Sequence, residues 1–241
     1  MTVSTTTIVV HLLATYAVLA VPWLGCLSHR NAQRRMRAGD PLAKLSRYRR
    51  ILIVQVVTIS VVCSLWLFGG IPGARLGLCV PRPWWLSAGL ALVIVGFHAW
   101  SGVRLRRKAI GIREKMGTRR GALLPESLVE LRWFAAVSII GGISEELLFR
   151  GFLFYYLSVY VPHINNLEKI LLTSLLFGIA HLYQGWRGVA ASGVSGVILA
   201  GLYVLGGGLL LPIVFHATGN MRALLIFRPG TTSVTMTQEE S

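Results

Sequence analysis

Apolar stretches, each about long enough to cross a lipid bilayer as a helix, make up most of this chain. A membrane-spanning helix needs about 20 consecutive, mostly apolar residues. Stretches of this kind cover residues 7–27, 51–70, 84–103, 131–158, 168–184, 188–206 and 209–227. Hydrophobic residues form 54% of the chain and charged residues 14%, which is too apolar for an ordinary soluble domain. The sequence therefore predicts an all-α, polytopic transmembrane helix bundle with about seven spans, within a range of six to eight.

The positive charge of the chain is concentrated beside these apolar stretches. The formal net charge is +15, and 16 of the 24 Lys and Arg residues lie in segments 30–50 and 104–120. Excess Lys and Arg mark the cytoplasmic connections of membrane proteins, where anionic lipid headgroups attract them. We therefore expect the lipid bilayer, and not nucleic acid, to be the partner of these charges. If the first three stretches each cross, the N-terminus lies outside and the C-terminus lies in the cytoplasm.

The chain divides into two membrane regions of different character. Residues 1–110 hold three spans whose interior polar candidates are His11, Gln55 and His98, and we interpret both histidines as hydrogen-bonded interior residues without a catalytic role. Residues 121–227 hold all of the polar motifs and form the expected catalytic core. Residues 228–241 are polar, and we expect them to be a disordered cytoplasmic tail.

Three polar motifs lie inside the apolar stretches of the second region. An ionised side chain in the middle of a membrane costs at least about 2.5 kcal/mol, so such residues are functional candidates. Of the nine carboxylates, only two lie deep in an apolar stretch. The residues of interest are Glu145, Glu146, Arg150, Phe177, His181, His216 and Asn220.

The spacing of these residues predicts different roles for the two carboxylates. Neighbouring residues on a helix are separated by about 100° in projection, so Glu145 and Glu146 point in different directions. Glu146 and Arg150 stand at i and i+4, with the acid first, which favours an ion pair. We therefore expect Glu146 and Arg150 to support the structure. Glu145 is left free to face a cavity and to act as a general base.

Two chemical schemes are open for the predicted site. In the first, Glu145 and His181 deprotonate a water molecule, while His216 and Asn220 donate hydrogen bonds to the oxyanion of a tetrahedral intermediate. In the second, Glu145, His181 and His216 bind a divalent metal such as zinc, because two histidines and a glutamate are a known catalytic zinc set. Residue types alone do not separate the two schemes. Phe177 stands four residues before His181, and we expect it to serve in packing.

The three motifs, in this order and spacing, resemble the CPBP family of intramembrane proteases. That family includes the type II CAAX prenyl endopeptidases and the Abi-like bacteriocin-processing or immunity proteins of bacteria. Its patterns are EExxxR, FxxxH and HxxxN, and the resemblance covers residues 121–227. The matching positions are Glu145, Glu146, Arg150, Phe177, His181, His216 and Asn220.

This resemblance implies a membrane hydrolase with its catalytic residues inside the bilayer. Glu145, His181, His216 and Asn220 would line a cavity, and the enzyme would cut a peptide bond in a hydrophobic, lipidated or membrane-delivered substrate. The family is often called a metalloprotease family, yet a metal-free mechanism is equally compatible with these side chains. Zinc therefore stays open as a cofactor. We expect a bacterial inner (plasma) membrane location.

Two other function classes are compatible with buried polar residues of this kind. A non-catalytic membrane scaffold or immunity protein could bind a peptide in the same cavity and would keep its function after Glu145→Gln. A proton-coupled carrier could use buried Glu and His residues as proton relays. The sequence contains no duplicated half with matched interrupted spans, which weakens the carrier interpretation.

Overall fold

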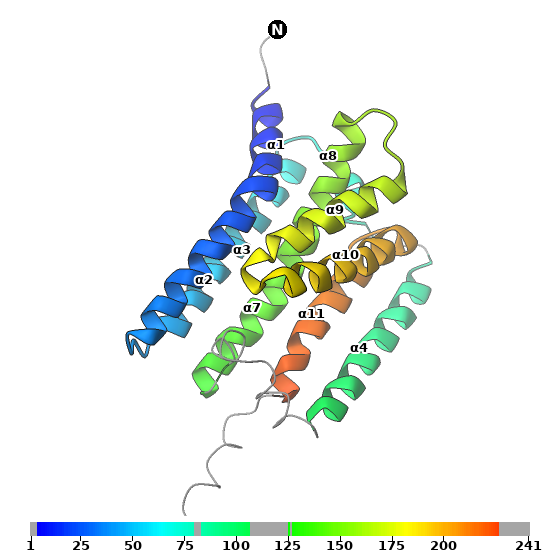
Figure 1. Ribbon diagram of the computed structural model, residues 1–241. Coiled ribbons are helices and arrows are strands. Elements are labelled where there is room, and N and C mark those ends of the chain that lie inside the picture. Colours follow the sequence, from blue (N-terminus) through cyan, green and yellow to red (C-terminus); the bar gives the residue numbers. More distant parts are fainter. Residues whose placement is uncertain (1–3, 80–82, 107–124, 126, 227–241) are drawn as a thin grey trace, which may run out of the picture.

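The computed structural model describes residues 4–79, 83–106, 125 and 127–226. This part is built from helices, without strands (Figure 1). The N-terminal helices are α1 (Thr5–Thr15), η1 (Tyr16–Ala20), α2 (Val21–Arg37), α3 (Ala43–Leu67), η2 (Gly73–Leu76) and α4 (Trp84–Arg106). The later helices are α7 (Leu128–Glu146), η3 (Leu147–Phe152), α8 (Leu153–Tyr160), α9 (Asn166–Ala180), η4 (Leu182–Gln184), α10 (Trp186–Gly206) and α11 (Leu210–Ile226).

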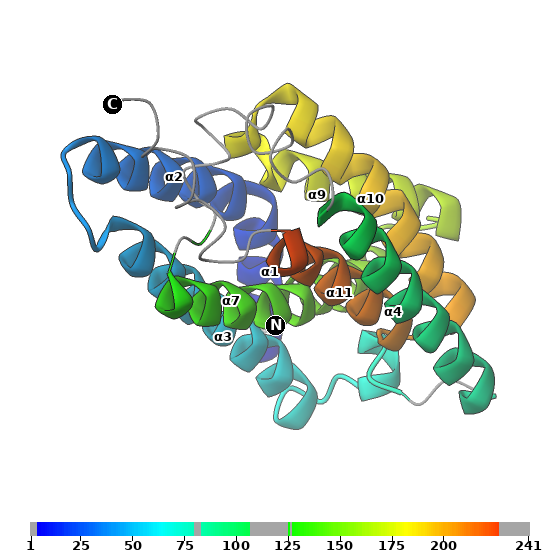
Figure 2. The same ribbon diagram turned by 90° about the horizontal axis from the view of Figure 1, so that it is seen from below.

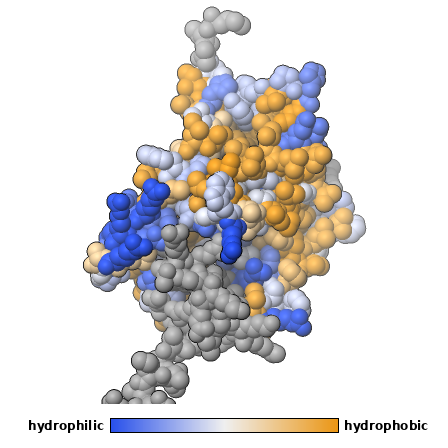
Figure 3. Space-filling model, viewed as in Figure 1, coloured by the Kyte–Doolittle hydropathy of each residue, from blue (hydrophilic) through white to orange (hydrophobic). Residues whose placement is uncertain are grey.

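Each apolar stretch expected to be a span is helical, which confirms the all-α fold. In the described residues, four helical runs have the length and hydropathy to cross a membrane, namely Thr5–Arg37, Ala43–Leu67, Trp84–Leu105 and Trp186–Gly206. The number of spans stays a prediction, because α9 and α11 have only 15 and 17 residues. Hydrophobic residues cover much of the face drawn in Figure 3, and hydrophilic residues gather at its lower left, where α2 ends.

Helices from the first region flank the helices that carry the polar motifs. Helix α3 packs along α7, and α4 packs along α11, on the other side of the bundle (Figures 1 and 2). Helices α9 and α10 pack together and are joined by the short helix η4, which also contacts α2. The expected region boundary between residues 110 and 121 and the expected tail at 228–241 lie outside the described residues, so both stay predictions.

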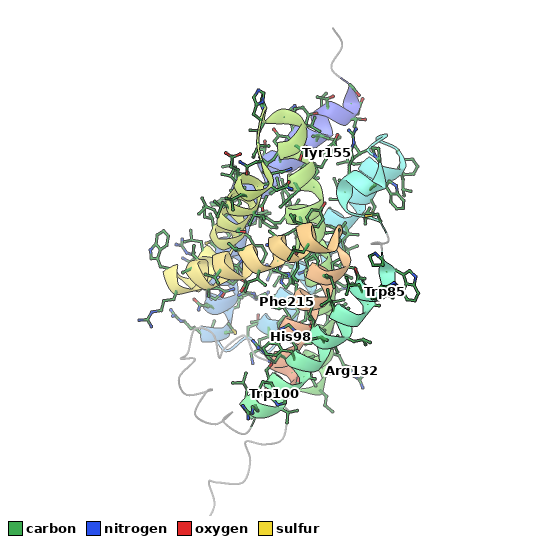
Figure 4. All side chains as sticks on the ribbon, turned by 90° about the vertical axis from the view of Figure 1, so that its right-hand side faces the viewer. Trp85, His98, Trp100, Arg132, Tyr155 and Phe215 are labelled. Carbon is green, nitrogen blue, oxygen red and sulfur yellow. The ribbon has the colours of Figure 1, made fainter. Side chains whose placement is uncertain are left out.

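The two histidines of the first region lie in different surroundings. His98 is buried, its Nδ1 lies 2.7 Å from Thr218 Oγ1, and its ring meets Phe215 edge-on. Figure 4 shows the two labelled rings between α4 and α11. His98 is therefore a hydrogen-bonded interior residue, as expected. His11 is exposed, although its Nδ1 lies 3.0 Å from the Tyr156 hydroxyl, so its expected interior position was wrong.

Glycines let α9 and α10 approach closely, as small residues do in membrane helix pairs. A Cβ added at Gly196 of α10 would lie only 3.0 Å from Cα and Cβ of Ser174, whereas one at Gly201 would meet nothing within 4 Å. We expect Gly196→Ala to destabilise the protein by about 1–3 kcal/mol because the helices must separate. Gly201→Ala on the same helix should be neutral or slightly stabilising. Thermal unfolding in detergent measures both, and equal shifts would contradict the packing argument.

Candidate active site

A π-helical turn forms the centre of the site. Helix α7 ends at Glu146, and the π-helix η3 continues the same helical rod from Leu147 to Phe152 with more residues per turn. Leu147, Leu148, Phe149 and Phe152 of this turn are at most 4% exposed, so the turn lies in the hydrophobic core. Single π-turns inside α-helices often occur at functional sites. Here the turn begins directly after the two carboxylates.

Three helices bring Glu145 and two histidines together. Glu145 is the last residue but one of α7, His181 follows the last residue of α9, and His216 lies in α11. Glu145 Oε2 lies 3.7 Å from Nε2 of His216 and 3.9 Å from Nε2 of His181. These distances are longer than hydrogen bonds. Among the described residues, this buried oxygen has no hydrogen-bond partner, so it can accept one from a bound molecule.

Glu146 is the second carboxylate, and it is fully buried. Its Oε1 accepts a hydrogen bond from Arg150 Nη1 at 2.9 Å, which confirms the expected ion pair. The same oxygen lies 2.7 Å from Nδ1 of His216. Arg150 is equally buried and donates from Nη2 to the carbonyl oxygen of Gly196 at 3.0 Å. The i, i+4 spacing predicted the ion pair, but nothing in the sequence indicated the bond to His216.

The hydrogen bonds of the two histidines fix their orientation. His181 Nδ1 lies 2.8 Å from the carbonyl oxygen of Phe177, so Nδ1 carries the proton and donates it. The Nδ1 of His216 likewise donates to the Glu146 carboxylate. In both rings Nε2 faces Glu145. A neutral ring therefore offers a lone pair at Nε2, while a protonated ring offers an N–H there.

Phe177 packs between the polar groups. Its ring is edge-on to Phe149 and to His216, and it lies 4.7 Å from the His181 ring centre. The Cζ atom of Arg150 lies 4.6 Å from the centre of the Phe177 ring. Phe177 thus separates the guanidinium from the histidines and holds both rings in place, which agrees with the expected packing role.

A cavity of about 530 Å³ adjoins Glu145 and His181. Its walls come from η1, α2, α3, the end of α7 with η3, and the end of α9 with the turn after it, and most of its lining surface is apolar. Leu24, Ile53 and Val54 line it and are also exposed, so the cavity opens between helices toward the lipid-facing surface. The sequence had placed no functional residue on α2 or α3. Their contribution to the cavity appears only in the fold, where α3 packs against α7 and α2 packs against α3 and η4.

Asn220 is not joined to this cluster by any hydrogen bond in the described part of the chain. It lies one turn beyond His216 on α11, and its side chain is exposed. The shared helix face was expected to bring Asn220 into the cavity. Asn220 is absent from the residues that line the described cavity, and its role in binding an oxyanion stays a prediction.

The arrangement fits a metal site poorly. A tetrahedral zinc ion about 2.1 Å from each ligand would need its ligand atoms about 3.4 Å apart. The two separations from Glu145 Oε2 exceed this by a few tenths of an ångström. Within the described residues, no group of three His, Cys, Asp or Glu side chains is placed to hold a metal ion. Glu145, His181 and His216 would therefore have to move before they could act as the expected ligand set.

Comparison with protein families adds an independent observation. Residues 127–222 match the family model described as type II CAAX prenyl endopeptidase Rce1-like. This segment belongs to the CAAX protease family. It runs from the N-cap of α7 into α11, so the CAAX protease segment contains all seven motif residues. The apolar helices, together with this match to a membrane protease family, indicate an integral membrane protein. No curated protein and no solved structure matches the chain.

Proposed function

We propose that this protein is an intramembrane endopeptidase that cuts a peptide bond in a membrane-associated substrate, with Glu145 as its general base. The observation that carries this proposal is the position of Glu145 Oε2, which is buried, has no hydrogen-bond partner among the described residues and faces Nε2 of His181 and His216 beside a large cavity. A buried oxygen without a hydrogen bond costs about 1–3 kcal/mol. Glu146 Oε2 also lacks a partner among the described residues, but Glu145 lines the cavity and Glu146 does not. A catalytic carboxylate must stay available to its substrate.

In the proposed mechanism, a water molecule binds between Glu145 and His181. Glu145 takes a proton from this water molecule while the water oxygen attacks the carbonyl carbon of the substrate. The resulting oxyanion is stabilised by the Nε2–H group of protonated His216, since the Glu146 carboxylate at Nδ1 favours the charged ring. The C–N bond then breaks, and the proton moves from Glu145 to the leaving amine. Asn220 remains a candidate second donor to the oxyanion.

The cavity supports a hydrophobic or lipidated substrate. Its lining is mostly apolar, and its exposed rim residues Leu24, Ile53 and Val54 would lie among lipid chains. A substrate could therefore enter sideways from the bilayer and reach Glu145 without leaving apolar surroundings. We place the protein in a bacterial inner membrane, with the basic end of α2 and α3 in the cytoplasm.

Peptide cleavage by the purified protein tests this function. Wild type in detergent is incubated with a library of membrane-associated and prenylated peptides in ¹⁸O-labelled water, and products are read by mass spectrometry. We expect one ¹⁸O atom in each new carboxyl group. His181→Ala should lose about 10²- to 10⁴-fold in rate.

The matched control is His163→Asn, because His163 is exposed in the connection after α8 and its φ of 61° suits asparagine. Its cleavage rate should equal that of wild type. Peptide binding without cleavage by any folded protein would favour the scaffold interpretation. Activity that is lost with a chelator and restored by zinc would favour the metal scheme over the mechanism given above.

A further inference from the structure

The cavity wall holds a buried polar side chain that the proposed mechanism does not use. Gln55 lies midway along α3, lines the cavity and is only 9% exposed. The residues on either side of it, Val54 and Val56, are exposed at 47% and 48%. Because α3 is long and apolar enough to cross the membrane, the lipid around its middle offers no hydrogen bond to an amide. Gln55 therefore needs a partner inside the protein or in the cavity.

The carbonyl oxygen of the Gln55 amide has no such partner among the described residues. This oxygen, Oε1, is buried and accepts no hydrogen bond there. Thr58 lies one turn further along α3 and lines the same cavity, but its hydroxyl donates to the Val54 carbonyl oxygen at 2.9 Å. An unpaired buried acceptor is costly, and a glutamine amide can both accept and donate. Gln55 thus has an unused acceptor for a molecule bound in the cavity.

The Gln55 amide lies against α7, close to the proposed general base. A Cβ added at Gly141 of α7 would lie only 2.6 Å from Gln55 Nε2, so a larger residue at this position would displace the amide. Gly141 stands four residues before Glu145, which is about 6 Å along the helix axis and on the same face. Gln55 and Glu145 both line the cavity. They are therefore about one helical turn apart along one wall.

A separation of one helical turn matches the repeat of an extended peptide. Such a chain covers about 3.3–3.6 Å per residue, and every second residue directs its backbone groups to the same side. A peptide whose carbonyl carbon lies beside Glu145 therefore presents another backbone group to Gln55 about two residues away. A peptide group carries an N–H donor and a C=O acceptor, and a glutamine amide can pair with both. A hydrocarbon chain offers neither.

We propose that Gln55 binds a backbone peptide group of the substrate, about two residues from the bond that is cut. This role rests on the proposed peptidase function, because it concerns the substrate in the same cavity. Gln55 holds the peptide extended along α7 and so keeps the carbonyl carbon of the cut bond beside Glu145. Because the contact is made to the backbone, it does not depend on the side chains of the substrate. Gln55 binds the substrate and takes no part in proton transfer.

A scan with backbone esters tests this contact. The probe is the member of the membrane-peptide library that binds the Glu145→Gln protein most tightly, and each of its backbone amides is replaced in turn by an ester, which removes one N–H donor. Binding to Glu145→Gln is measured by fluorescence in uncharged detergent. We expect an ester at the Gln55 contact to weaken binding about 10- to 100-fold. Adding Gln55→Leu should abolish the effect of that ester, whereas adding Thr58→Val, on the same cavity wall, should keep it.

Gly141→Ala moves the Gln55 amide without replacing it. The added Cβ meets the end of a flexible side chain, so the amide can shift while the helices stay in place. We expect Gly141→Ala to abolish the effect of the same ester and to lower kcat/KM for the all-amide peptide about 10- to 100-fold. Gly201→Ala, whose Cβ would meet nothing within 4 Å, should do neither. Gly141→Ala keeps the test decisive if Gln55→Leu fails to fold.

Thermal unfolding separates substrate binding from a structural role of Gln55. Gln55→Leu removes an unpaired buried oxygen, so its unfolding midpoint should equal or exceed that of wild type while kcat/KM falls about 10- to 100-fold. A lower midpoint together with an unchanged ester scan would make Gln55 a structural residue and overturn the proposal.

The ester scan and peptide cleavage also separate the Gln55 contact from the proposed function. A Gln55-dependent ester effect without cleavage by wild type would support peptide binding at Gln55 and argue against the protease. Cleavage by wild type with identical ester scans in the presence and absence of Gln55 would overturn the Gln55 contact and leave the protease standing. In a cleaved peptide, the sensitive ester should lie about two residues from the cut bond, and a sensitive ester at a distant position would contradict the proposed placement along α7.

Discussion

Glu145→Gln is expected to slow peptide cleavage by about 10²- to 10⁴-fold while leaving the fold intact. The amide has nearly the same shape as the carboxylate but cannot take a proton from water. Glu145 makes no hydrogen bond to another described residue, and its side chain is 31% exposed, so the substitution removes no hydrogen bond within this part of the chain and changes only the longer contacts with His181 and His216. Initial rates on a cleaved peptide, together with thermal unfolding in detergent, measure the two effects separately.

Glu168→Gln provides the matched control for this loss. Glu168 lies in the first turn of α9, where its carboxylate accepts a hydrogen bond from the Asn165 backbone N–H. Glutamine can accept the same bond, so the control changes a carboxylate to an amide outside the site. If Glu145→Gln kept the wild-type cleavage rate, Glu145 could not be the general base, and the mechanism proposed above would be wrong.

Much of the site could be predicted from helix periodicity, but its connections between helices could not. The spacing of Glu146 and Arg150 fixed their ion pair, because both residues lie on one helix. The contact of His216 with Glu146 depends on how α11 packs against α7, and the sequence does not encode that geometry locally. For the same reason the sequence did not predict the position of Asn220. It shares a helix face with His216 but does not line the described cavity.

The role of the first region was the larger gap in the sequence-based interpretation. Its helices looked like plain spans, and Arg47 looked like one of many basic residues in a cytoplasmic connection. Arg47 is buried whereas Arg49 is exposed, and Arg47 contacts His29 of α2 and the Tyr183 ring, which local sequence does not predict. A charge pattern reports which side of the membrane a segment occupies. It does not report which of those charges faces inward.

Arg150→Met is expected to give the largest loss of stability, about 3–5 kcal/mol. Arg150 and Glu146 are both fully buried, so removing the guanidinium leaves the carboxylate with His216 as its remaining described partner. The hydrogen bond to the Gly196 carbonyl oxygen is lost as well. Methionine fills a similar volume, so the loss of stability reflects the missing charge and hydrogen bonds more than an empty cavity. Thermal unfolding in detergent should show a midpoint lower by about 10 °C.

The double variant Glu146→Gln/Arg150→Met separates the charge from the contacts. It removes both members of the pair, so no buried charge is left without its partner, and we expect it to regain a large part of the lost stability. The double variant should nevertheless stay poorly active. Glutamine at position 146 can still accept a hydrogen bond from His216 Nδ1, but it carries no negative charge to stabilise the protonated ring. A double variant no more stable than Arg150→Met would mean that the guanidinium acts through Gly196 and the Phe177 ring, and not by neutralising Glu146.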